Sequence, residues 1–341
     1  MVATERRVHR DGGDTLGRVE QNDRRERRDQ ARRRTERQRR TVLTATGAGA
    51  LMVAIALGLA ALSGGPEKGG TKEAAPPPPE LPRGGRSIFP ESRVVGFYGA
   101  PQDEELGVLG IGPPASIAGK LERQARPYAE GPGARPILPA FELIAVIANA
   151  SAGDDGKYRT RLEPETIRRY LAAARRARAL LLLDIQPGRA DFPEEMRALE
   201  GFLAQPDVSL ALDPEWHMGE NEVPGETIGS MTADELNAVS ARLSEIVRRG
   251  RLPEKMLVVH QFTKDMVDNR ERLRRYPGVE LVLNVDGFGD RKLKVDKYNE
   301  FVRGRDPARH GFKLFYREDT NLMEPRDVLS LRPQPEFVVY E

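Results

Sequence analysis

The sequence predicts an α/β protein: a (β/α)8 TIM barrel preceded by a disordered basic tail and one transmembrane helix. Two observations predict the barrel. Eight short runs rich in Val, Leu and Ile alternate with seven segments of helical period, and together they occupy residues 94–341. Such strict alternation gives a parallel sheet covered by helices, and this number of elements is that of a barrel. A third observation, an uncharged apolar stretch near the N-terminus, predicts the membrane helix.

The predicted strands lie at 94–98, 137–142, 179–184, 208–213, 255–260, 280–285, 312–316 and 337–340. The predicted helices lie at 116–128, 164–178, 193–204, 232–249, 265–276, 291–302 and 325–331. Several helices have clear start signals, such as Pro164 at a first helical position and a capping box from Thr232 to Glu235. A doubly wound open sheet is the alternative, but the glycine-rich first turn typical of that fold is missing.

The first 40 residues form a basic tail. They contain fourteen Arg, no Lys and eight acidic residues, which gives a net charge of +6. Because the tail has almost no apolar residues, it is predicted to be disordered. The whole chain carries only +2, so residues 64–341 carry a net charge of −4. This acidic balance argues against nucleic acid as a partner of the barrel.

Residues 41–63 are predicted to form a transmembrane helix. The run 42–62 has no charged residue, and at about 1.5 Å per residue it is long enough to cross a hydrocarbon core of about 30 Å. A cleaved signal peptide is the alternative, but its apolar region would be shorter. Three arginines, at 37, 39 and 40, precede the run. The positive-inside rule therefore predicts a single-pass protein of the cell membrane with a cytoplasmic N-terminus and an extracytoplasmic barrel.

Residues 64–93 are predicted to be a linker, because they are rich in Pro and Gly. The barrel domain is then 94–341. The chain has no cysteine, which excludes disulfides, thiolate metal sites and cysteine nucleophiles. Gly110 and Gly112 lead directly into two prolines, so no dinucleotide-binding motif is present. We predict no cofactor and no resident metal.

Candidate site residues lie where each strand ends, because active sites of such barrels lie at the C-terminal ends of the strands. Six of the eight predicted strands end in a carboxylate, and side chains two apart on a strand face the same side. Crowding of like charges costs stability, so it favours a functional role. The candidate catalytic residues are Glu215, Asp213, Asp286 and Asp184. The candidate substrate-binding residues are Tyr98, Glu142, Gln186, Trp216, His260, Gln261, Asn284, Tyr316 and Glu318.

A carboxylate-rich barrel mouth with Trp216 and Tyr98 at its edge resembles the glycoside-hydrolase-like barrel superfamily. The resemblance implies two carboxyl groups on opposite sides of a glycosidic bond, one of them a proton donor. It implies that Glu215 is the general acid, because this residue follows the fourth strand. The partner it implies is a carbohydrate or another cell-envelope polymer.

In this interpretation Asp286 or Asp184 supplies the second carboxylate, and Asp213 tunes Glu215 by like-charge repulsion. Glu318 matches the family's nucleophile position after strand seven only approximately. The Asn-Glu dipeptide of that family is replaced here by Asp213-Pro214-Glu215. The chain is also similar to membrane-anchored proteins of actinobacterial type, a resemblance that implies no activity.

Three other functions remain open. A metal-dependent hydrolase could take its ligands from the same carboxylates together with His217 and His260. A Schiff-base enzyme could use Lys313, within predicted strand seven, unless that amine forms a buried ion pair. A non-catalytic envelope module would hold a glycan or a partner at the mouth. The sequence predicts no particular oligomeric state.

Overall fold

The computed structural model describes residues 77–341 apart from 102, 132 and 305. The predicted tail, the predicted transmembrane helix and the first part of the predicted linker lie outside these residues. Across the part of the chain that is described, no helix is both long and apolar enough to cross a membrane.

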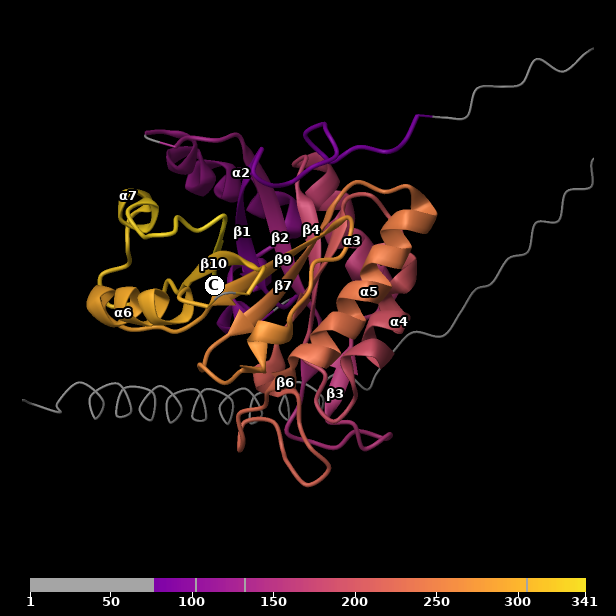
Figure 1. Ribbon diagram of the computed structural model, residues 1–341. Helices are drawn as coiled ribbons and strands as arrows, with labels where there is room; N and C mark the ends of the chain where they lie inside the picture. The colour runs from indigo at the N-terminus through magenta and orange to yellow at the C-terminus, as the bar shows by residue number, and fades with distance from the viewer. Residues whose placement is uncertain (1–76, 102, 132, 305) are drawn as a thin grey trace, which may run out of the picture.

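Eight parallel strands close into a barrel (Figure 1), and this confirms the predicted fold of the C-terminal region. Strand β1 pairs with both β2 and β11, which closes the sheet. The strands are β1 (Arg93–Gly99), β2 (Ile137–Ala148), β4 (Leu180–Ile185), β5 (Val208–Leu212), β7 (Lys255–Gln261), β9 (Val279–Val285), β10 (Arg309–Leu314) and β11 (Phe337–Tyr340). Strand β3 (Arg159–Arg161) adds antiparallel to the end of β2. Strands β6 (Met231–Thr232) and β8 (Val267–Asp268) form a separate small pair.

Helices follow most of the strands on the outside of the barrel. They are α2 (Pro114–Ala125), α3 (Pro164–Arg176), α4 (Phe192–Leu203), α5 (Ala233–Gly250), α6 (Arg291–Phe301) and α7 (Pro325–Leu329). Short 3-10 turns are η1 (Glu104–Leu106), η2 (Val108–Gly110), η3 (Arg126–Ala129), η4 (Pro214–Trp216) and η5 (Arg270–Arg272). The predicted capping box is present, because Thr232 and Glu235 exchange side-chain and backbone hydrogen bonds at the start of α5.

The predicted helix at 265–276 is wrong. This segment contains β8 and η5 instead, and Asn269 between them has a left-handed backbone with φ of 58°, which interrupts a right-handed helix. Arg270 then binds the Gln261 side chain, the Phe301 carbonyl and the Asp306 carboxylate. These tertiary contacts of Arg270 therefore override the helical periodicity of the local sequence.

Predicted strand seven was placed too late in the chain. Strand β10 begins at Arg309 and ends at Leu314, because the next backbone N–H, that of Phe315, donates to the Asp319 carboxylate instead of to a neighbouring strand. The first residues of β10 are polar and only half-buried, so an apolar run does not mark them. As a consequence, Tyr316 follows the strand and does not belong to it.

Alternation along β5 divides its side chains between the two sides of the barrel wall, as predicted. Ala211 belongs to the apolar cluster inside the barrel. Val208, Leu210 and Leu212 belong to the cluster between the barrel and its helices. Each fully buried aliphatic side chain of this kind stabilises the fold by about 1.5–3 kcal/mol.

Residues 81–89 close the N-terminal end of the barrel. Leu81, Ile88 and Phe89 are buried in the interior cluster beside Val94 and Phe337. The Ile88 backbone N–H also donates to a carboxylate oxygen of Glu254 at 2.7 Å. With this end filled by apolar side chains, the polar side chains of the interior gather at the opposite, C-terminal end.

Candidate functional site at the barrel mouth

A layer of polar side chains crosses the barrel at the C-terminal ends of the strands. It contains Tyr98 on β1, Glu142 on β2, Asp184 on β4, His260 on β7, Asn284 on β9 and Lys313 on β10, with Gln186, Asp213 and Asp286 just beyond β4, β5 and β9. These nine side chains are all at least nine-tenths buried. The structure therefore brings together most of the residues that the sequence singled out, and it does so inside the mouth.

One side of this layer is a chain of hydrogen bonds between two carboxyl groups. The Tyr98 hydroxyl donates to Asp184 at 2.9 Å. The Gln186 amide donates to the Tyr98 hydroxyl at 3.3 Å and, at 3.5 Å, to Asp213. The groups that join the two carboxyls are thus a phenol and an amide, neither of which carries a charge.

Burial raises the pKa values of both carboxyls in this chain. For Asp213 the pKa rises to about 8; the charges of Asp184 and Glu215 add to the rise, and His260 opposes it. For Asp184 the pKa rises to about 6, with His260 again opposing the effect of burial. Asp213 therefore holds a proton at neutral pH, whereas Asp184 loses its proton below neutrality.

The other side of the layer is an imidazole between two carboxylates. His260 Nδ1 lies 3.0 Å from Asp286, and His260 Nε2 lies 3.2 Å from Glu142. Burial alone would lower the pKa of His260, but Asp286 and Glu142 outweigh it and raise the pKa well above its ordinary value. The ring is therefore an imidazolium that joins β2 to β9 across the interior. Asn284 completes the group by donating to Asp286 at 2.6 Å.

Lys313 adds a second positive charge to the mouth. Its Nζ lies 2.7 Å from Glu341, 3.4 Å from Asp286 and 3.6 Å from the centre of the Tyr98 ring. Burial would lower the pKa of Lys313, but Asp286 and Glu341 reverse this effect and raise the pKa above its ordinary value. The amine is thus a buried ion-pair partner, the alternative that the sequence left open beside a Schiff-base role, which requires a neutral amine.

Glu215 and Trp216 form the edge of the mouth. Both belong to η4, directly after Asp213; Glu215 is buried, whereas Trp216 is half-buried. The Glu215 carbonyl accepts a hydrogen bond from the Gly229 backbone N–H at 2.8 Å. The His217 ring lies against Phe192, with the ring centres 5.1 Å apart, and Nδ1 contacts the Ser230 carbonyl. These contacts bring the end of the loop after β5 back against η4 and fix His217 against α4.

Three predicted substrate-binding residues lie outside this buried polar layer. Gln261 is buried on the outer side of β7, where its side-chain oxygen accepts from Arg270. Tyr316 is exposed, donates to Gln124 on α2 and stacks on Tyr340. Glu318 is half-buried after β10, and burial together with the charge of Glu341 raises its pKa.

Lys313 and Glu341 are the mouth residues that the sequence reasoning did not assign to the site. The sequence offers Lys313 as a nucleophile or as a buried ion-pair partner, and it does not single out Glu341. The signal that could have found Lys313 is alternation along β10. With β10 ending at Leu314, Lys313 faces inward like Gly311, which pairs with Asn284 on the neighbouring strand β9. The error in the position of strand seven concealed this.

The loops after β2, β4 and β5 form one connected wall beside the mouth. The Arg189 backbone N–H donates to the Lys157 carbonyl at 2.7 Å, and its guanidinium lies 4.1 Å above the Tyr158 ring. The Met218 backbone N–H donates to the Gly188 carbonyl at 2.7 Å. Side chains of this wall can therefore contact anything that reaches the mouth from the side of β4 and β5.

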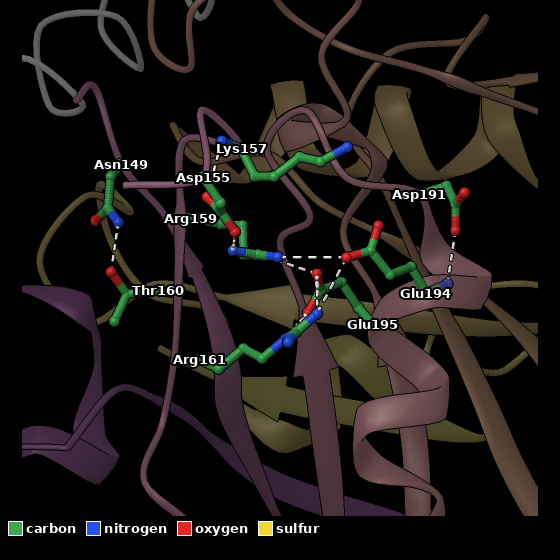
Figure 2. Close-up of polar contacts among 9 residues, drawn as sticks. All are labelled: Asn149, Asp155, Lys157, Arg159, Thr160, Arg161, Asp191, Glu194 and Glu195. Atoms are coloured by element: carbon green, nitrogen blue, oxygen red, sulfur yellow. Dashed lines mark hydrogen bonds and ion pairs between the residues drawn. The ribbon is translucent and has the colours of Figure 1, made fainter. Parts of the chain in front are cut away.

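A buried carboxylate fixes the outer part of this wall to α4. Figure 2 shows Arg159 and Arg161 of β3 converging on Glu195, with ion-pair distances of 2.7 and 2.6 Å. Glu194 lies within 3.4 Å of the same two arginines. Because Glu195 is fully buried, the charge has no access to water and depends on these partners.

Replacing Glu195 by alanine is expected to lower the free energy of unfolding by about 3 kcal/mol, because the substitution leaves the largely buried Arg159 without its main partner. Urea denaturation of the full chain measures the loss. Glu165→Ala is the matched control, since that carboxylate is exposed and pairs with Arg168 on the surface of α3; its expected loss is about 0–1 kcal/mol. Equal losses would contradict a special role for the buried network.

The geometry of the described residues does not support metal binding. Among them, no three His, Asp or Glu side chains are arranged so that they could hold an ion together. The metal-dependent interpretation therefore has no candidate centre in this part of the chain.

No protein-family model matches the sequence, and no curated protein matches it. Among solved structures, the fold is similar to the Clostridial cellulose synthase subunit Z from Clostridioides difficile. The TM-score is 0.38 and the sequence identity is 9%, over 74% of this chain and 91% of that one. A similarity at this level carries no information about the substrate of this chain.

Proposed function

We propose that the barrel hydrolyses a glycan, with Asp213 as the proton donor. The observation that carries the proposal is that one mouth holds two carboxyl groups in different surroundings. Asp213 hydrogen-bonds to an uncharged amide, Gln186, whereas Asp286 lies between the cations His260 and Lys313. Glycosidic cleavage requires this difference, because one carboxyl must carry a proton and the other a negative charge.

In this mechanism the Asp213 carboxyl transfers its proton to the leaving glycosidic oxygen as the bond to the sugar breaks. The Asp286 carboxylate stabilises the positive charge that develops on the sugar, or it takes a proton from the attacking water. This assignment exchanges the roles that the resemblance implied for Asp213 and Glu215. Burial then raises the pKa of Asp213, and the charges of Asp184 and Glu215 add to this effect, so the donor stays protonated.

Tyr98 and Gln186 position the proton donor and do not transfer protons themselves. Burial and the charge of Asp184 raise the pKa of Tyr98 well above its ordinary value, so the phenol stays protonated. Its hydroxyl accepts from Gln186 and donates to Asp184. Trp216, half-buried at the edge, supplies an apolar surface for a sugar ring.

A non-catalytic glycan-binding module is the second candidate. The observation that favours it is the burial of the nine side chains in the polar layer, of which Asp213 is the most exposed at 7%. Because the mouth is filled by its own side chains, a glycan would contact the rim, which includes Trp216 and the wall of loops. Binding without cleavage is the outcome that distinguishes this function from hydrolysis.

We further propose that the barrel is held outside the cytoplasm by a membrane helix at 41–63. The positive-inside rule supports this placement, because arginines 37, 39 and 40 directly precede the apolar run, whereas the first basic residue after it is Lys68. A glycan of the cell envelope would then be within reach. Fractionation and protease protection of whole cells test the topology independently of any activity.

The activity is tested by incubating the full chain with carboxymethylcellulose, chitosan and a peptidoglycan digest, and by measuring new reducing ends. Asp213→Asn with Glu215→Gln is the inactive control. Release of reducing ends by the native chain alone supports hydrolysis. Retardation in a glycan-containing native gel without any release supports the binding module, and neither retardation nor release overturns both functions for these glycans.

A further inference from the structure

The N-terminal end of the barrel, opposite the mouth, is the end at which the described chain begins (Figure 1). Residues 77–90 run across it and are fixed to the last turns of the helices. Arg86 donates to the carbonyls of Arg251 and Leu252 after α5. Arg178, after α3, donates to the carbonyl of Pro82. Residue 77, the first that the structure describes, therefore lies at this end of the domain.

A hollow of about 770 Å³ lies at this end between α2, α3 and the N-terminal segment. Three arginines line it, Arg83, Arg176 and Arg178, all exposed. Glu122 is the one acidic residue of its lining and pairs with Arg83. The hollow therefore keeps an excess of positive charge.

A second hollow, of about 320 Å³, lies between α5 and the start of β9. Arg274, Arg275 and Tyr276 line it. Both arginines are exposed, and neither forms an ion pair with any residue that the structure describes. Glu280 shares this lining, but its carboxylate is already paired with Arg309.

Helix ends explain Arg176 among the arginines that line the two hollows, but they do not explain Arg83, Arg274 or Arg275. The dipole of a helix favours cations in its last turn, and Arg175, Arg176, Arg248 and Arg249 occupy such positions in α3 and α5. Arg83 precedes the first strand, and Arg274 and Arg275 lie in the loop before β9. Their positive charges stabilise no helix of the fold, and Arg274 and Arg275 neutralise no described carboxylate.

We propose that this end of the barrel docks on an anionic phospholipid surface, with the two arginine-lined hollows receiving headgroup phosphates. A guanidinium group binds phosphate through two parallel hydrogen bonds to two of its oxygens. Arginines close to an anionic leaflet are also attracted to it. The opposite end of the barrel is rich in carboxylates, so the same field orients the mouth away from the membrane. The proposal does not depend on hydrolysis at the mouth.

Hydrogen exchange of the full chain in lipid nanodiscs tests the docking. Backbone amides of 272–280 and 174–180 are expected to exchange roughly tenfold more slowly in discs containing phosphatidylglycerol than in pure phosphatidylcholine discs. High salt is expected to remove the difference. The variant Arg176→Ala, Arg274→Ala, Arg275→Ala is expected to lose the protection. The matched control, Lys264→Ala, Lys292→Ala, Arg317→Ala, removes three exposed cations that follow β7, β9 and β10 at the mouth end and is expected to keep it.

Three results would overturn the proposal. Equal exchange in the two kinds of disc shows that the end does not dock. Equal loss of protection in the control variant shows that net charge, not this face, is responsible. The same protection of both segments by inorganic phosphate in phosphatidylcholine discs shows a site for free phosphate, not a lipid surface.

Discussion

Asp213→Asn is expected to lower kcat for glycan hydrolysis by about 10²–10⁴-fold, the loss typical of a missing general acid. Asparagine has nearly the same shape as a protonated aspartic acid and still accepts a hydrogen bond from Gln186, but it has no proton to give. The substrate should therefore still bind, with KM little changed. Initial rates of reducing-end release over a range of substrate concentrations separate the two constants.

The pH profile of the native chain gives an independent check on this role. Because the pKa of Asp213 is raised to about 8, kcat/KM is expected to fall as the pH rises through that value and the donor loses its proton. Asp265→Asn is the control, since that carboxyl is exposed on the loop after β7 and should leave both rate and profile unchanged. A native profile without an alkaline limb would contradict the assignment of Asp213.

The same carboxyl also makes folding stability depend on pH. In the folded chain Asp213 binds its proton more tightly than in the unfolded chain, where its pKa is 3.8. Stability should therefore decrease as the pH rises from about 4 to 8, and Asp184 should contribute over the lower part of this range, to about 6. Asp213→Asn is expected to flatten this dependence in thermal unfolding curves.

Alternation allowed the sequence to predict the barrel and the acidic side of its mouth. The parity of β5 places Asp213 inward with Ala211, and Asp184 follows the same rule on β4. Both strands are uniformly buried and begin and end where apolar runs do. Where burial is complete, composition and period are sufficient to locate the strand and its inward side.

The cationic side of the mouth was harder to predict, because its residues depend on contacts across the barrel. The pairing of His260 with Glu142 joins side chains 118 residues apart in sequence, which no local period encodes. Gln261 looks equivalent to His260 in the sequence, but it faces outward toward Arg270. Strand order fixes which elements are neighbours, whereas these pairs also need the closed barrel and its register.

His260→Gln is expected to lower the free energy of unfolding by about 3–5 kcal/mol, because it leaves the buried carboxylates Glu142 and Asp286 without the cation between them. Urea denaturation measures the loss. In the folded chain the pKa of His260 is raised, so its contribution is fully present below the unfolded pKa of about 6.5 and is lost as the pH rises through the folded value. The difference between native chain and variant should be largest in mildly acid solution.

A double-mutant cycle distinguishes the lost charge pair from a simple loss of packing. Glu142→Gln removes the carboxylate that His260→Gln leaves unpaired, so the double variant is expected to be more stable than the sum of the two single losses predicts. Additive losses would mean that the imidazolium fills space and does not neutralise Glu142. The cation also opposes the raised pKa values of Asp184 and Asp213. In His260→Gln the alkaline limb of hydrolysis should therefore move to higher pH, a shift that a packing defect would not produce.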